Sequence, residues 1–163
     1  MNRIVVNILL LLLLLPIGAF GWQQPAAWAG ESVGQERAAY LELSRVRALS
    51  KPGVTFNDYR NALVPAREYV GLLRGSDATT TLLRQAMGYY EQALSVWSLQ
   101  TDNEFPVDSL RTDEATGAAI LGQCPGIPRF HYKERDQIYV KDAVDCMWRQ
   151  AAERLDRAPG DLR

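Results

Sequence analysis

The residues with the clearest chemistry in this 163-residue chain are its two cysteines, Cys124 and Cys146. Two thiols can be joined in only one way, and in an exported protein a disulfide is their expected state. Closing a loop of ~23 residues contributes roughly 3 kcal/mol in the chain-entropy model. The alternative is a pair of free thiols or metal ligands, but His131 is the only histidine, so a metal ion would lack ligands. We therefore predict a Cys124–Cys146 disulfide and no metal site.

Two further sets of side chains have the right chemistry for catalysis, and each has a simpler explanation. Cys124 and His131 are the residue types of a nucleophile–base pair, but no third residue that would orient the imidazole can be identified. The intervening Pro-Gly-Ile-Pro at 125–128 is typical of a turn. Asp142 and Asp145 have the chemistry of paired acid–base carboxylates. Asp145, however, falls in a row of alternating charge at steps of four, which is typical of a solvated helix face.

Motifs that bind cofactors are missing from the sequence. It contains no glycine-rich phosphate loop, no nucleophile elbow and no Cys-x-x-Cys-His for haem attachment. The sequence therefore predicts a protein that is not an enzyme and that carries no cofactor.

The N-terminal segment has the order of features of a secretory signal. Arg3 supplies a positive charge, Leu9–Leu15 form the centre of an apolar stretch, and the Ala-Trp-Ala at 27–29 provides the small residues that signal peptidase requires. We expect residues 1–29 to be removed, leaving an exported protein, periplasmic or secreted, that begins at Gly30. The alternative is an uncleaved membrane anchor, because the apolar stretch is close to the ~17-residue minimum for crossing a bilayer.

The remaining segment, residues 30–163, has the length of one domain with one hydrophobic core. Without Arg3, the only charged residue before Gly30, it keeps 17 of the 18 basic residues and all 19 acidic ones, so its net charge is about −2. Nucleic-acid-binding proteins carry a basic excess, so we do not expect a nucleic-acid partner.

Four segments of the mature chain carry apolar residues at the alternating three- and four-residue spacing of amphipathic helices. The predicted helices cover approximately residues 33–50, 56–74, 79–100 and 136–157. Thr55 and Asp58 form a capping box before the second of them. Pro65 lies within the apolar stripe of that helix, which predicts one kinked helix rather than two short ones.

These helices predict an all-α, four-helix bundle-like single domain. Trp97 and Trp148 are the largest inner-face side chains of the last two predicted helices, so we expect them to lie near each other in the core. Between these helices lies a long loop, 101–135, which includes one possible short helix. Compact domains rarely keep a loop of this length without a role. The predicted disulfide would tether the loop to the last helix.

Aromatic and polar side chains in and beside this tethered loop are the best candidates for a binding surface, because loops on rigid scaffolds often carry function. The candidates are Phe130, His131, Tyr132 and Tyr139. The alternative is that Phe130 and Tyr132 only plug one end of the bundle.

The sequence thus favours an exported, non-catalytic helical protein that binds another protein or another copy of itself. A bundle that binds a small ligand between its helices is the alternative function. An enzyme is the least favoured class.

Overall fold

The computed structural model describes residues 27–101 and 107–162. Most of the predicted signal segment lies outside the described residues, so export and cleavage after residue 29 stay predictions. The first described helix begins at Ala27, three residues before the predicted mature start at Gly30.

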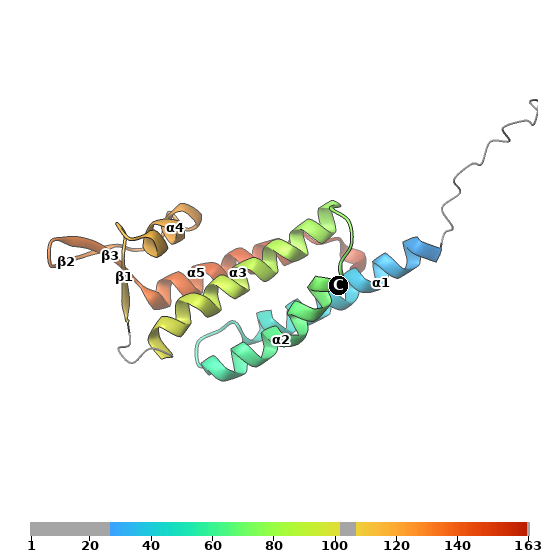
Figure 1. The fold of residues 1–163 in the computed structure, drawn as a ribbon, viewed down its shortest axis with the longest axis horizontal. Helices are drawn as coiled ribbons and strands as arrows, with labels where there is room; N and C mark the ends of the chain where they lie inside the picture. The colour runs from blue at the N-terminus through green and yellow to red at the C-terminus, as the bar shows by residue number, and fades with distance from the viewer. Residues whose placement is uncertain (1–26, 102–106, 163) are drawn as a thin grey trace, which may run out of the picture.

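The described chain is mostly helical, as the sequence predicts, and its four long helices lie alongside one another (Figure 1). They are α1 (Ala27–Leu49), α2 (Phe56–Leu72), α3 (Ala78–Thr101) and α5 (Val140–Asp156). The most extensive packing is between α3 and α5 and between α1 and α2. These two pairs meet through α2 and α3, and also through contacts of α1 with α3 and α5.

The start of α2 shows why the chain becomes helical there. The Thr55 hydroxyl oxygen accepts a hydrogen bond from the backbone N–H of Asp58 (3.1 Å), and the hydroxyl donates to the Asp58 carboxylate (2.7 Å). This is the predicted capping box, which satisfies a backbone donor that has no partner within the helix. α2 then continues through Pro65 to Leu72 as one helix.

The core is formed by the inner faces of the long helices. Its largest fully buried side chains include Tyr59, Leu63, Leu83, Tyr90 and Met147. At one end of the core the Trp97 and Trp148 rings lie 5.7 Å apart in an edge-to-face arrangement, which confirms the predicted proximity of the two tryptophans.

The predicted all-α fold is confirmed only in part, because the mostly helical chain also contains a small sheet. A three-stranded antiparallel sheet with the order β1-β3-β2 lies between α3 and α5 along the chain. Its strands are β1 (Ser109–Arg111), β2 (Phe130–Tyr132) and β3 (Arg135–Tyr139), and the short helix α4 (Ala115–Gln123) connects the first two. The possible short helix within the predicted loop 101–135 is therefore present as α4, whereas the strands of this segment were not predicted.

The predicted start of the last helix, at about residue 136, is wrong. Residues 135–139 form β3, and α5 begins at Val140. Tyr139 is both the last residue of β3 and the residue that precedes the first turn of α5. Strand and helix are thus joined with no residue between them.

Candidate functional site

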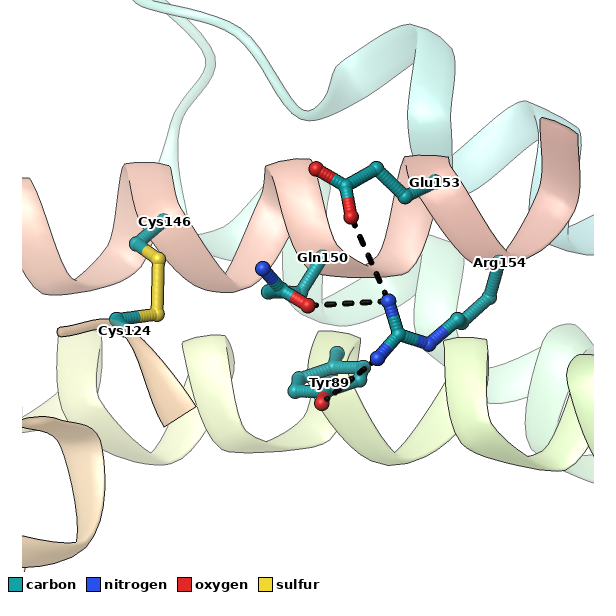
Figure 2. Close-up of a disulfide and its surroundings, with 6 residues drawn as sticks. All are labelled: Tyr89, Cys124, Cys146, Gln150, Glu153 and Arg154. Atoms are coloured by element: carbon teal, nitrogen blue, oxygen red, sulfur yellow. Dashed lines mark hydrogen bonds and ion pairs between the residues drawn. A yellow bond between two sulfur atoms is a disulfide. The ribbon is translucent and has the colours of Figure 1, made fainter. Parts of the chain in front are cut away.

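The disulfide attaches the end of α4 to α5. Cys124 and Cys146 are joined with an S–S distance of 2.02 Å, and both residues are buried. Figure 2 shows the bond beside a contact between α3 and α5, in which Arg154 of α5 donates hydrogen bonds to Gln150 of the same helix (3.0 Å) and to the Tyr89 hydroxyl of α3 (3.3 Å). The predicted disulfide is therefore confirmed. It holds the segment that leads into β2 against the helices.

The same bond excludes the nucleophile–base alternative, because the Cys124 sulfur is not a free thiol. His131 instead lies opposite Asp136 in the β2–β3 register, and its Nδ1 is 3.1 Å from the Asp136 carboxylate. Both side chains are exposed. This pair therefore stabilises the hairpin surface and has no nucleophile to activate.

The candidate aromatic residues lie on a hairpin that extends beyond the ends of the long helices (Figure 1). Phe130 pairs with Gln137, and Tyr132 pairs with Arg135. Since side chains alternate between the two faces of a strand, Phe130, Tyr132 and Tyr139 share one face of the sheet. We call these three residues the aromatic face. His131 points to the opposite face, so the structure brings together three of the four predicted surface residues.

The aromatic face is accessible to solvent. The Phe130 and Tyr139 rings are stacked, with centroids 4.3 Å apart. Tyr132 is 53% exposed and Tyr139 is 50% exposed, whereas Phe130 is half-buried beneath its neighbours. The alternative in which Phe130 and Tyr132 plug one end of the bundle does not describe Tyr132, since so much of its surface faces water.

The turn of the hairpin has an unfavourable backbone conformation for its residues. Lys133 and Glu134 both have positive φ angles, 47° and 63°. Two-residue turns of this kind favour Asn-Gly or Asp-Gly, because an ordinary side chain in the left-handed region costs about 1–2 kcal/mol. The Lys133 ammonium lies 5.1 Å from the centre of the Tyr132 ring, within range of a cation–π interaction.

Asp142 and Asp145, the other predicted candidates, lie on α5 and line a groove of about 610 Å³. The predicted i, i+4 charge ladder does not form as salt bridges at Asp145: no cation of the described chain comes within 4 Å of its carboxylate. Burial raises the pKa of Asp145, and the nearby Asp142 charge adds to the effect, while Lys141 and Arg149 oppose it. Residues from several segments of the chain line the groove, so the periodicity of one helix does not predict it.

No protein-family model, no curated protein and no solved structure matches this chain. Within the described residues, none of the helices has the length and apolar character needed to cross a membrane.

Proposed function

We propose that the protein is exported and acts without catalysis by binding another protein through the aromatic face. In this proposal the four long helices serve as a bundle-like scaffold that presents the hairpin. One observation carries the proposal: two half-exposed tyrosines, Tyr132 and Tyr139, lie on one face of a hairpin that extends beyond the helices. Tyrosine is enriched at protein interfaces because it supplies a large apolar area together with a polar hydroxyl.

The strained turn supports this proposal. Conformations of this cost persist where the surrounding structure holds them and are concentrated at functional sites. A turn of Asn-Gly would be easier to form, yet the chain has Lys133 and Glu134 at the tip, beside the aromatic face. A contact between these charged side chains and a partner protein would explain why Lys133 and Glu134 occupy the turn in place of Asn-Gly.

The face of the sheet is a better contact surface than the free edge of β2. Pro128, which has no backbone N–H, precedes the strand, and Lys133 follows it; proline and lysine both discourage pairing at strand edges. A symmetric pairing of β2 between two copies, centred on His131, would also place Arg129 opposite Lys133 of the second copy. Like charges in this position are unfavourable, so a different protein is favoured over a second copy.

Export is supported by the disulfide, because such bonds persist in oxidising compartments and are rare in the cytosol. The N-terminal pattern of charge, apolar run and small residues points to the same compartment.

The proposal is tested by site-specific photocrosslinking in the native cells. A photoreactive phenylalanine analogue is placed at Tyr132, and in a separate strain at Tyr69, an exposed tyrosine on α2. We expect a discrete adduct with one other protein from position 132 and none from position 69. Adducts of equal yield at both positions, or none at position 132, would reject the aromatic face as the contact. An adduct at twice the mass of the chain would instead identify a second copy as the partner.

A second pair of variants separates binding from folding. Tyr132→Ser combined with Tyr139→Ser should abolish the adduct formed by an analogue placed at Lys133, while circular dichroism stays unchanged. The control Tyr69→Ser should leave that adduct intact.

A further inference from the structure

Two adjoining hollows lie where α3, α4 and α5 meet. One has a volume of about 310 Å³ and the other about 360 Å³. Gln92 and Gln123 line both, so the two form one elongated site, which we call the glutamine hollow. Neither Tyr132 nor Tyr139 lines it, and it shares no lining residue with the groove that contains Asp145. It is therefore a separate site from both features described above.

The lining of the glutamine hollow is rich in side-chain amides. Gln85 and Gln92 lie on the same face of α3, on either side of Tyr89, and Gln123 is the last residue of α4. Each amide offers one carbonyl acceptor and two N–H donors. Within the described chain none of these three amide groups forms a hydrogen bond. The site therefore has a hydrogen-bonding capacity that the fold itself does not use.

The side-chain carbonyl oxygen of Gln123 is the most informative of these groups. It is buried and has no hydrogen-bond donor among the described atoms, which is an unfavourable state for a polar group. The residue as a whole is partly exposed, so a rotation of its side chain brings the oxygen to the hollow. Gln123 directly precedes Cys124, and the disulfide to Cys146 holds this part of α4 against α5. A ligand that supplies an N–H donor here would satisfy the oxygen.

Gly88 provides an independent sign that another molecule approaches this surface. It lies in the middle of α3, where glycine is less favourable than alanine. A Cβ atom at this position would meet nothing within 4 Å, so packing within the described chain does not require a glycine. Glycine is typical of positions at which a ligand comes close to the backbone, and Gly88 lines the hollow.

The charge of the lining favours a neutral ligand. Among the described residues that line the hollow, only Arg154 is charged. Its guanidinium lies 3.5 Å from the Glu153 carboxylate and donates hydrogen bonds to Gln150 and to the Tyr89 hydroxyl (Figure 2). Because this cation already has a carboxylate beside it, the hollow offers little attraction to an anion and none to a cation.

The half of the hollow beside α4 has small apolar walls. Ala115 and Ala119 of α4 face Val96 of α3 across it. Short side chains of this kind leave room for a methyl group, and the amide of Gln123 lies at the same place. An amide N–H and a methyl group carried together are the two features that this half of the hollow accommodates.

We propose that the glutamine hollow binds a neutral, N-acetylated sugar oligomer. The acetamido N–H would donate to the Gln123 carbonyl oxygen, and the acetamido methyl group would lie against Ala119. Sugar hydroxyl groups both donate and accept hydrogen bonds, as do the amides of Gln85 and Gln92. The backbone at Gly88 would be covered by a sugar ring. Since the site is separate from the aromatic face, it can exist whether or not the hairpin binds a protein.

The test uses triacetylchitotriose as the probe and cellotriose as its counterpart, which carries a hydroxyl in place of each acetamido group. Binding is measured by calorimetry, and magnetisation transfer from the protein to the acetamido methyl protons reports their contact. We expect saturable binding of triacetylchitotriose, with a dissociation constant of about 1 mM or lower. Cellotriose should bind at least about tenfold more weakly, because it lacks the acetamido contacts.

Two variants separate binding from folding. Gln123→Leu should weaken binding of triacetylchitotriose about tenfold or more without lowering the midpoint of thermal unfolding, because it removes an unpaired buried oxygen. Gly88→Ala should also weaken binding about tenfold, yet raise the midpoint, since alanine favours the helix. A glycine with only a structural role would not produce weaker binding together with a more stable fold.

Two controls keep the result specific. Gly71→Ala in α2 also adds a Cβ that meets nothing within 4 Å, and it should leave the affinity unchanged because Gly71 does not line the hollow. Tyr132→Ser should leave it unchanged as well, which distinguishes this site from the proposed protein-binding surface. No saturable binding of triacetylchitotriose up to about 10 mM, equal binding of cellotriose, or full affinity in Gln123→Leu or Gly88→Ala would overturn the proposal.

Discussion

The Tyr59 hydroxyl donates a hydrogen bond to the backbone carbonyl of Tyr90, with 2.9 Å between the two oxygens. The Tyr90 hydroxyl is itself buried without a hydrogen-bond partner among the described atoms. Burial raises the pKa of both tyrosines well above the ordinary value, so both side chains stay neutral across the physiological pH range. Two adjacent tyrosines in one core therefore make opposite contributions through their hydroxyl groups.

Removing each hydroxyl separately should reveal this difference. Tyr59→Phe should lower the free energy of unfolding by about 1 kcal/mol, because a buried hydrogen bond is lost. Tyr90→Phe should leave it unchanged or raise it by up to about 1 kcal/mol, since an unpaired polar group leaves the core. Urea unfolding of the two variants measures both values. If Tyr90→Phe were the more destabilising change, the Tyr90 hydroxyl would have a partner that the structure does not show.

Asp77 should stabilise the start of α3 in a pH-dependent way. Its carboxylate accepts a 2.9 Å hydrogen bond from the backbone N–H of Thr80, and this bond lowers the pKa of Asp77. A lowered carboxyl pKa stabilises the fold above the unfolded-state pKa, and that contribution is lost as the pH falls through the folded-state value. Asp77→Ala should therefore cost about 1 kcal/mol at pH 7, and the difference from wild type should shrink below about pH 4.

Asp77→Asn is the matched control, because an asparagine oxygen can accept the same hydrogen bond without titrating. Thermal unfolding between neutral and acidic pH should show that Asp77→Asn is less destabilised than Asp77→Ala by about the same amount at every pH, because neither variant titrates at position 77. Equal destabilisation by the two variants at every pH would argue that the charge of Asp77, rather than its hydrogen bond to the backbone, dominates at this position.

Two glycines of α4 should respond oppositely to alanine. A Cβ atom at Gly117 would overlap the backbone carbonyl of Arg111, so Gly117→Ala must displace β1 from α4 and should be strongly destabilising. A Cβ at Gly122 meets nothing within 4 Å, so Gly122→Ala should stabilise the helix by up to about 1 kcal/mol. Equilibrium unfolding of both variants tests the close approach of α4 to β1, and similar effects would contradict it.

The hairpin turn should become more stable when its residues suit its backbone. Lys133→Asn with Glu134→Gly should relieve the left-handed strain and slow hydrogen exchange of the β2–β3 amides, corresponding to about 1 kcal/mol or more. If Lys133 contacts the partner, the same variant should crosslink less from position 132. Faster exchange in the variant would show that the native side chains stabilise the turn.

Loss of the disulfide should lower the stability of the fold. Cys124→Ser with Cys146→Ser should lower the free energy of unfolding by about 3 kcal/mol, because the unfolded chain regains its loop freedom. The matched comparison is Gly122→Ala, which alters neighbouring α4 and leaves the bond in place. An unchanged free energy of unfolding in the serine variant would show that the disulfide does not stabilise the fold.

The long helices could be predicted because each repeats its apolar spacing over many turns, so that occasional polar residues do not hide the pattern. The capping box at Thr55 and the pairing of the two cysteines needed only local chemistry or simple counting. Strands of three to five residues are too short to show a repeating alternation. Leu110, which is buried in the sheet, is a single apolar residue between Ser109 and Arg111. Ile138, also buried, is followed directly by Tyr139 and by Val140 of the next helix, so it reads as part of the helix.

The error at the start of α5 has a specific physical cause. Asp136 is a residue type that often precedes a helix, but its carboxylate instead meets His131 across the hairpin. The groove was missed because it depends on the distance between Pro52 and Pro128, which lie far apart in the sequence. The order of residues along one helix contains no information about such a separation.

The direct junction of β3 and α5 gives the hairpin a mechanical consequence. Tyr139 ends the strand and Val140 begins the helix. No flexible linker therefore separates β3 from α5, and a displacement of the hairpin tip is passed on to the helix. The hairpin and the start of α5 therefore move together. The disulfide at Cys146, a little under two turns along the helix, is the point at which α5 is held. A force applied at Tyr132 would therefore act on the first turns of α5, which contain Asp142 and Asp145.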